Sequence, residues 1–151
     1  MYFDRYGISK DVCVSNGYKV FFGTDWLDDF EYEAFDKLFQ GKTLRLALKN
    51  SQSETTTFSS FDEAIRLESQ LVDVDKLILT ETSMLYISDD RDIFLFAAQE
   101  AEIADLIKDI TAAGGKTYST LVKSAVVEPK KEVKEFFDYW DPLNFELGAQ
   151  E

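Results

Sequence analysis

The sequence contains no histidine and a single cysteine among its 151 residues. Without histidine, the chain has no Ser-His-Asp or Cys-His nucleophilic centre and no imidazole general base. The lone Cys13 cannot form an internal disulfide, favours a reducing compartment, and leaves no zinc site of the usual kind. We therefore expect a cytoplasmic protein that holds no metal and no cofactor.

Glycine-rich loops and long apolar runs are missing as well. The seven glycines are scattered, so neither the P-loop nor the dinucleotide-binding fingerprint occurs. No apolar run approaches the roughly 18 residues of a membrane span. The N-terminus carries early charges and lacks the apolar core of a secretory signal. These absences predict a soluble protein that makes no membrane contact.

Basic residues are few relative to acidic ones. The chain has 16 Lys and Arg against 29 Asp and Glu, which gives a net charge of −13. Such a surface repels phosphate backbones and anionic membranes, whereas it attracts basic proteins and speeds their encounter. The charge therefore predicts a basic protein partner and no nucleic-acid binding. The alternative is that the acidity serves solubility only.

Apolar residues, in contrast, are plentiful. Hydrophobic residues make up 45% of the chain, with 13 Phe and 7 Tyr, which is enough to build one core. We expect a single domain over residues 1–151, with a flexible C-terminal tail from about residue 143. Helical patterns are mixed with short strands joined by short links. The sequence therefore predicts an α+β fold with a mostly antiparallel sheet and about four helices.

Turn signals and alternation locate the expected strands. Asn16-Gly17 is the preferred type I′ pair and predicts a hairpin between Val12–Ser15 and Tyr18–Phe22. Alternating apolar residues predict a half-buried strand over Thr43–Lys49. The segment Asn50–Ser60 is dominated by Ser and Thr and predicts a mobile loop. Further strands are expected at Lys76–Thr80, Met84–Ser88, Asp92–Ala97 and Thr117–Val127.

Amphipathic periodicity and capping signals predict four helices. They are expected from the N-cap Thr24 to Gly41, from the capping box of Ser60 and Glu63, over about Gln99–Ala113, and from Pro129 to Pro142. Their core-facing residues are expected to be Trp26, Leu27, Phe30, Ala34 and Leu38; Phe61, Ala64, Ile65, Leu67 and Leu71; Ile103, Leu106, Ile107 and Ile110; and Val133, Phe136, Phe137 and Trp140.

The stretch DWLDDFEYEAFD, residues 25–36, has six acids among twelve residues and no base. On a helical wheel Asp25, Asp29, Glu33 and Asp36 fall within about 80° of one another, with Tyr32 in the same sector. Like charges four residues apart destabilise a helix mildly, and a merely solvated helix normally mixes the two signs. We interpret this face as a surface that meets a cationic partner, the alternative being a face kept acidic for solubility.

The third expected helix repeats this arrangement in a weaker form. Glu102, Asp105 and Asp109 share one face, and Lys108 lies beside them. Crowded like charges cost stability, and a partner that supplies Lys and Arg converts this cost into a favourable association. The candidate partner-binding residues are Asp25, Asp29, Tyr32, Glu33, Asp36, Glu102, Asp105 and Asp109.

Carboxylates are the one catalytic chemistry that the composition leaves open. Asp89-Asp-Arg-Asp92 fails as a calcium loop, because Arg91, Ile93 and Phe94 stand where oxygen ligands and a glycine are needed. A pair of acids facing each other across a cleft would indicate a hydrolase, and the sequence alone cannot select such a pair. We expect a protein that is not an enzyme.

In size, acidity and the DWLDDFEYEAFD surface, the chain resembles the bacterial immunity proteins of contact-dependent and other polymorphic toxin systems. This resemblance is one of type and rests on no signature motif, and acidic DNA mimics share it. It implies an inhibitor that binds a basic toxin, a nuclease in many such systems, and occludes its active-site region. The alternative is a non-catalytic regulatory or adaptor domain that binds its partner through apolar contacts.

Overall fold

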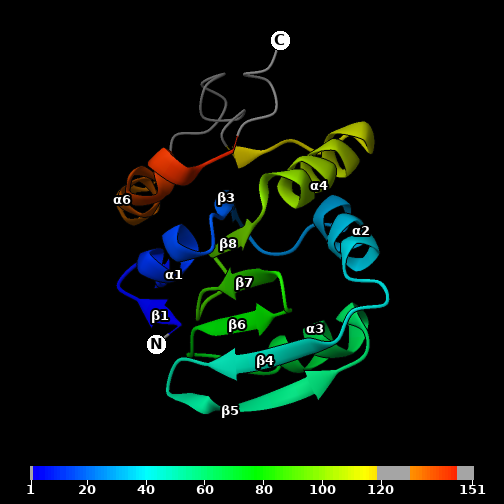
Figure 1. Ribbon diagram of the computed structural model, residues 1–151, viewed down its shortest axis with the longest axis vertical. Coiled ribbons are helices and arrows are strands. Elements are labelled where there is room, and N and C mark those ends of the chain that lie inside the picture. Colours follow the sequence, from blue (N-terminus) through cyan, green and yellow to red (C-terminus); the bar gives the residue numbers. More distant parts are fainter. Residues whose placement is uncertain (1, 119–129, 146–151) are drawn as a thin grey trace.

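A computed structural model describes residues 2–118 and 130–145 and confirms the α+β fold with a mostly antiparallel sheet. Strands β3, β8, β7, β6, β4 and β5 form, in this order, one antiparallel sheet, and β1 and β2 form a small second one (Figure 1). The strands are β1 Phe3–Asp4, β2 Gly7–Ile8, β3 Lys19–Thr24, β4 Leu44–Leu48, β5 Ser51–Phe58, β6 Lys76–Leu79, β7 Ser83–Ile87 and β8 Ile93–Ala98. The helices are α1 Lys10–Ser15, α2 Asp29–Leu38, α3 Phe61–Glu68, α4 Glu100–Ala112, α6 Lys131–Trp140 and the short 3₁₀-helix η1 Asp141–Leu143.

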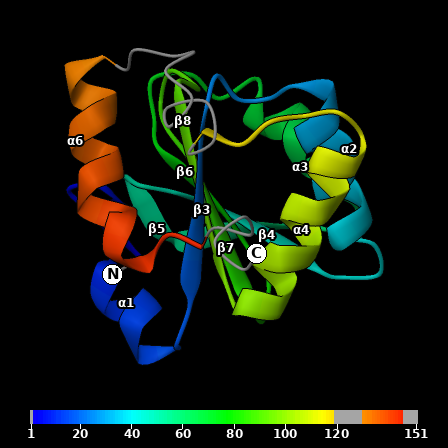
Figure 2. The ribbon, with the colours of Figure 1, turned by 90° about the horizontal axis from the view of Figure 1, so that it is seen from above.

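Helices cover both faces of the large sheet. Figure 2 shows α2, α3 and α4 on one side of the strands and α1 and α6 on the other. Period-two alternation explains this division, because successive side chains of a strand point to opposite faces. In β8, Phe94 and Phe96 join the core under α2–α4, whereas Leu95 and Ala97 join the core under α1 and α6. Both cores are rich in aromatic rings.

The core under α6 contains Trp140, which is 0% exposed. Its indole Nε1 donates a hydrogen bond to the main-chain oxygen of Tyr6 at 2.8 Å, so the polar edge of the ring is satisfied. Phe136 of the same helix is also buried and packs on Phe22 and Tyr86. The expectation that α6 turns Phe136 and Trp140 into the core is therefore confirmed.

The hairpin expected around Asn16-Gly17 is wrong, because residues 10–15 form helix α1. Helical packing buries Cys13 completely and leaves Val14 60% exposed, so the two neighbours face different environments. Asn16 caps the helix, and Gly17 has a positive φ of 68°. An Asn-Gly pair supplies the left-handed residue of a hairpin turn and of a helix C-terminus alike, and here it ends a helix.

The mobile loop expected at Asn50–Ser60 is also wrong, because most of it is strand β5 at the edge of the sheet. Thr55, Thr56 and Thr57 are exposed, so an edge strand with little buried surface resembles a polar loop in composition. Threonine nevertheless favours extended structure. The strands expected near β4, β6, β7 and β8 are confirmed.

The C-terminal part of the described chain lies against β3. Asn144 forms a parallel bridge with Val20, and Phe145 N donates to Val20 O at 2.9 Å. The rest of the expected tail, and all but the first two positions of the strand expected at Thr117–Val127, lie outside the described residues.

Candidate functional site

Helix α2 begins with a capping box rather than at Thr24. The Asp28 carboxylate accepts a hydrogen bond from Glu31 N at 2.7 Å, and Asp28 N donates to Glu31 Oε1 at 3.1 Å. This reciprocal pair satisfies two of the amides that a helix start leaves unbonded. Asp25 and Trp26 consequently lie in the connection from β3 and are not part of the helix.

The buried face of α2 differs from the expected stripe. Ala34, Phe35 and the following Phe39 are buried, whereas Phe30 is 39% exposed. Phe35 and Phe39 both contact the ring of Phe96 in the sheet. Since residues 25–28 are not helical, the core-facing side of α2 is set by these two rings, and the expected position of Phe30 in the core is wrong.

The opposite side of α2 presents carboxylates to solvent. Asp29 and Glu33 are exposed, and Asp36 is partly exposed. Among the described residues, none of these three carboxylates belongs to an ion pair. Asp29 and Glu33 stand four residues apart, where like charges repel. This part of the expected acidic face therefore exists as a surface of uncompensated negative charge.

Tyr32 is held by α3 rather than by the carboxylates of its own helix. Its hydroxyl donates to Asp62 Oδ1 at 2.8 Å, and Asp62 also pairs with Arg66 Nε at 2.9 Å. Desolvation, together with the hydrogen bond to Asp62, raises the pKa of Tyr32 to about 12. The phenol therefore stays neutral at physiological pH and joins α2 to α3.

Helix α4 lies beside α2 and runs antiparallel to it (Figures 1 and 2). At one end a Cβ added to Gly115, just after α4, would lie 3.0 Å from Phe30 Cβ. Further along, Lys37 Nζ lies 3.4 Å from Asp109 Oδ1. Beyond the other end of α2, Lys42 Nζ lies 3.7 Å from Glu102 Oε2. The buried stripe of α4, expected at Ile103, Leu106, Ile107 and Ile110, is confirmed.

The acids of these two neighbouring helices are together called the acidic helix pair: Asp29, Glu33, Asp36, Glu102, Asp105 and Asp109. The helices contact each other through Phe30 and Lys37 of α2, and Asp36 lies near Tyr32 on the side of α3. Asp105 is exposed and lies between the two acids of α4 that pair with lysines. The Lys37–Asp109 pair is mostly in solvent, with side chains 71% and 37% exposed, so it contributes about 0–1 kcal/mol. The surface thus remains negative despite these contacts.

Asp25 lies apart from the acidic helix pair, beside the β7–β8 turn. Asp25 N donates to Asp92 O at 2.8 Å. Nearby, burial raises the pKa of the Glu31 carboxyl to about 8, with the Asp28 and Asp25 charges adding to the effect. Asp28, Glu31 and Asp92 were not expected to gather there, although the Asp-x-x-Glu spacing of the capping box is visible in the sequence.

A buried polar network holds the connection from β3 to α2 in place beside the β7–β8 turn. Glu68 is 0% exposed, and its Oε1 accepts hydrogen bonds from Trp26 Nε1 at 3.2 Å and from Arg91 Nη2 at 2.9 Å. Its Oε2 accepts from Lys76 Nζ at 2.7 Å. Glu68 therefore ties the β3–α2 connection and the β7–β8 turn to α3 and β6.

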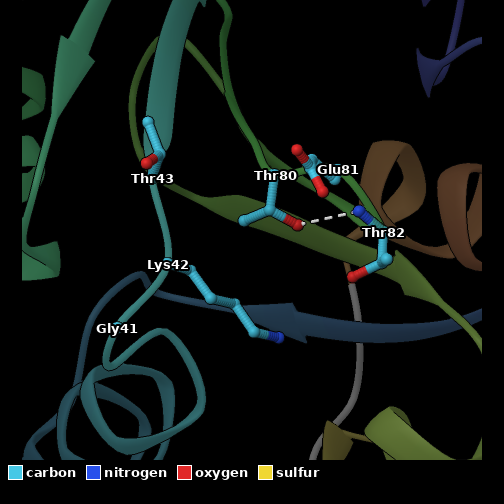
Figure 3. Close-up of a pocket in the computed structure, with 6 residues that line it drawn as sticks. All are labelled: Gly41, Lys42, Thr43, Thr80, Glu81 and Thr82. Carbon is cyan, nitrogen blue, oxygen red and sulfur yellow. Dashed lines mark hydrogen bonds between the residues drawn. The ribbon is translucent and has the colours of Figure 1, made fainter.

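A polar cavity of about 300 Å³ borders the acidic helix pair at the end of the sheet. Figure 3 shows that the α2–β4 connection and the β6–β7 turn form its walls. Thr80 Oγ1 is already engaged, because it accepts from Thr82 N at 3.2 Å and bonds Ser83 Oγ at 2.7 Å. The residues that line the cavity are Gly41, Lys42, Thr43, Thr80, Glu81 and Thr82.

Within residues 2–118 and 130–145, no group of three or more Cys, Asp or Glu side chains is arranged to hold a metal ion. In the same part of the chain, no helix has the length and apolar character needed to cross a bilayer. No protein-family model matches the sequence, and neither a curated protein nor a solved structure matches it.

Proposed function

We propose that this protein is an acidic inhibitor, of the immunity-protein type, that binds a basic toxin through the acidic helix pair. The toxin is proposed to be a nuclease whose active-site region carries Lys and Arg for nucleic acid. The carboxylates of α2 and α4 take the place of phosphates, and no residue of this chain performs chemistry. Inhibition results from stoichiometric occlusion.

The observation that carries the proposal is the antiparallel contact of α2 and α4. It sets the acid-bearing segment 29–36 beside residues 102–109, and Asp29, Glu33 and Asp36 have no ion-pair partner among the described residues. Such a rigid surface loses little conformational freedom when a cationic partner docks. It also accelerates association through long-range attraction.

Apolar docking, the alternative, has less support. The large apolar side chains exposed in the described part are Val14, Phe30 and Val72. They belong to α1, to α2 and to the connection that follows α3, and α1 and α2 lie on opposite faces of the sheet (Figure 2). Three scattered side chains do not build a contiguous apolar patch.

The test compares two variants that change the net charge equally. D29K/E33K/D36K reverses the acidic face of α2, and D11K/E132K/E135K reverses three exposed acids on α1 and α6, across the sheet. Each is co-expressed with the basic protein that co-purifies with the chain from its native host, and cell survival and binding rate are measured at several salt concentrations. The α2 variant is expected to lose protection and the control to keep it.

Two outcomes contradict the proposal. One is full protection by the folded α2 variant, since this result removes the acidic helix pair as the contact surface. The other is an association rate that does not fall as salt rises from about 50 to 500 mM, because electrostatic steering is screened over this range.

A further inference from the structure

The large sheet has one edge without a neighbour in the described part of the chain. Strand β5 is eight residues long and pairs on one side only, with β4. At the opposite edge, Asn144 and Phe145 contact β3 at Val20. An unpaired strand offers a row of amides and carbonyls to another chain, and proteins normally protect such an edge.

Residues 55–58 of β5 lack the usual protections of an edge strand. The strand SQSETTTF contains no Lys, Arg or Pro, and its single charged residue is Glu54. A register irregularity lies near Ser51, opposite Ala47 and Leu48, whereas the pairing from Thr55 to Phe58 is regular. Residues 55–58 therefore form a regularly paired edge without charged residues or proline, built largely from threonine, a residue that favours strands.

The neighbouring ladders determine which amides of β5 face outward. Lys49 N donates to Asp75 O, beyond the end of the β4–β6 ladder. Thr80 N donates to Ser83 O, at the end of the β6–β7 ladder. Main-chain groups alternate sides along an antiparallel strand. Both bonds therefore direct the odd-numbered residues of β4 toward β6 and the even-numbered residues toward β5.

The pairing of β5 with β4 then determines which main-chain groups of β5 point toward β4 and which point outward. Leu46 bonds toward β5 and opposes Thr56, so the main chain of Thr56 points inward. Thr55 and Thr57 then direct their N–H and C=O groups to the open edge. Side chains alternate across the sheet, which places Thr56 and Phe58 on the α3 side, as the packing of Phe58 against the core under α2–α4 shows.

We propose that the outer edge of β5 binds an extended segment of a basic protein as an additional antiparallel strand. The main chain of Thr55 and Thr57 supplies hydrogen bonds, and the exposed Glu63 in the first turn of α3, which belongs to no ion pair among the described residues, favours Lys or Arg in the incoming strand. A second copy of this chain is disfavoured as the occupant, because it adds a further charge of −13 and no base to the edge. The outward amides of Thr55 and Thr57 lie at the β5 edge, whereas α4 packs near the opposite β3 edge (Figure 1).

The probe is a blocked eight-residue peptide of alternating Lys and Thr, with an alternating Glu and Thr peptide as the charge control. Thr57→Pro removes one outward N–H, which an edge strand tolerates, and Thr57→Val keeps this N–H while changing the same side chain. Binding is measured by fluorescence anisotropy, and amide hydrogen exchange of the full chain locates the contact. Thermal unfolding shows whether each variant folds.

The basic peptide is expected to bind and to slow exchange at Thr55 and Thr57, while the acidic peptide does not bind. T57P is expected to weaken binding at least tenfold and T57V less than twofold. The slowed exchange at Thr55 and Thr57 is expected to persist in D29K/E33K/D36K. Failure of the proposed toxin binding by the acidic helix pair would therefore leave this result unchanged. Absence of binding by the basic peptide, equal binding by T57P, or edge protection that rises with protein concentration alone would overturn the proposal; the last would identify a second copy as the occupant.

Discussion

Glu68 and Lys76 form an ion pair that is shut off from solvent on both sides. The Oε2–Nζ distance is 2.7 Å, and the side chains are 0% and 1% exposed. Lys76 Nζ also donates to the main-chain oxygens of Glu68 and Leu71, so all three of its protons have acceptors. A buried ion pair is stable only when its remaining donors and acceptors are satisfied in this way.

Replacement of one partner of this pair is expected to destabilise the fold strongly. Glu68→Gln leaves the Lys76 ammonium buried without a counter-charge, and the free energy of unfolding should fall by about 3–5 kcal/mol. Urea denaturation followed by circular dichroism measures the loss. Lys134→Met, which breaks the exposed i,i+4 pair with Asp138, is the control and should leave the stability almost unchanged. Equal losses in both variants would contradict the importance assigned to burial.

Glu31 is expected to make stability depend on pH. Its pKa in the folded state is about 8, above the ordinary value of 4.5, so the folded state holds a proton that the unfolded state releases between these values. The stabilising contribution is complete below about pH 4.5 and is lost as pH rises through 8. Glu31→Gln resembles the protonated carboxyl and should exceed the native protein in stability by up to roughly 5 kcal/mol at pH 9, with little difference at pH 4.

Glu33→Gln provides the control for this experiment, because it removes the same formal charge from an exposed position of the same helix. Thermal unfolding of the three proteins from pH 4 to 9 should give parallel curves for the native chain and Glu33→Gln. The curve of Glu31→Gln should diverge from them above about pH 4.5 and run parallel to them again above about pH 8. Three parallel curves would show that Glu31 titrates normally.

Gly23 is expected to tolerate no side chain. A Cβ at this position would overlap the ring of Phe94, its partner residue in the β3–β8 ladder. Gly23→Ala should therefore lower the free energy of unfolding by about 1–3 kcal/mol, as overpacked cores do. Gly17→Ala meets no neighbouring atom and strains only the positive φ of 68°, which costs about 1 kcal/mol. A smaller loss for Gly23→Ala than for Gly17→Ala would contradict the tight packing of β3 on β8.

Tyr32→Phe tests whether this phenol stabilises the fold or contacts a partner. Loss of the bond to Asp62 should lower stability by about 1 kcal/mol. A double-mutant cycle with Asp62→Asn should recover a coupling energy of similar size. Partner binding should change little, because the hydroxyl is already engaged. Weaker partner binding with unchanged stability would instead assign Tyr32 to the interface.

The elements with strong periodicity could be predicted from the sequence. Strands β6, β7 and β8 are separated by links too short for anything but a meander, and α4 repeats its apolar residues at helical spacing. Each signal is local and points to the same structure as the tertiary packing. The second acidic segment could likewise be predicted on α4, at Glu102, Asp105 and Asp109.

The wrong predictions rest on sequence patterns that fit two different structures. Asn16-Gly17 suits a hairpin turn and a helix end, and a run of Ser and Thr suits a loop and an edge strand. The expected start of α2 at Thr24 is too early, because Asp28, the actual cap, also fits the interior of the acidic helical pattern. The contact of α2 with α4 and the hydrogen bond of Tyr32 to Asp62 join residues distant in sequence, so no local pattern encodes them.

The short contact of Asn144 and Phe145 with Val20 has a consequence for how assemblies of this protein can grow. A sheet with two open edges can extend in both directions and form fibres, because every added strand presents a new edge. Here one edge is obstructed at Val20 by the chain itself. Complexes built at β5 are therefore expected to stop at a finite size.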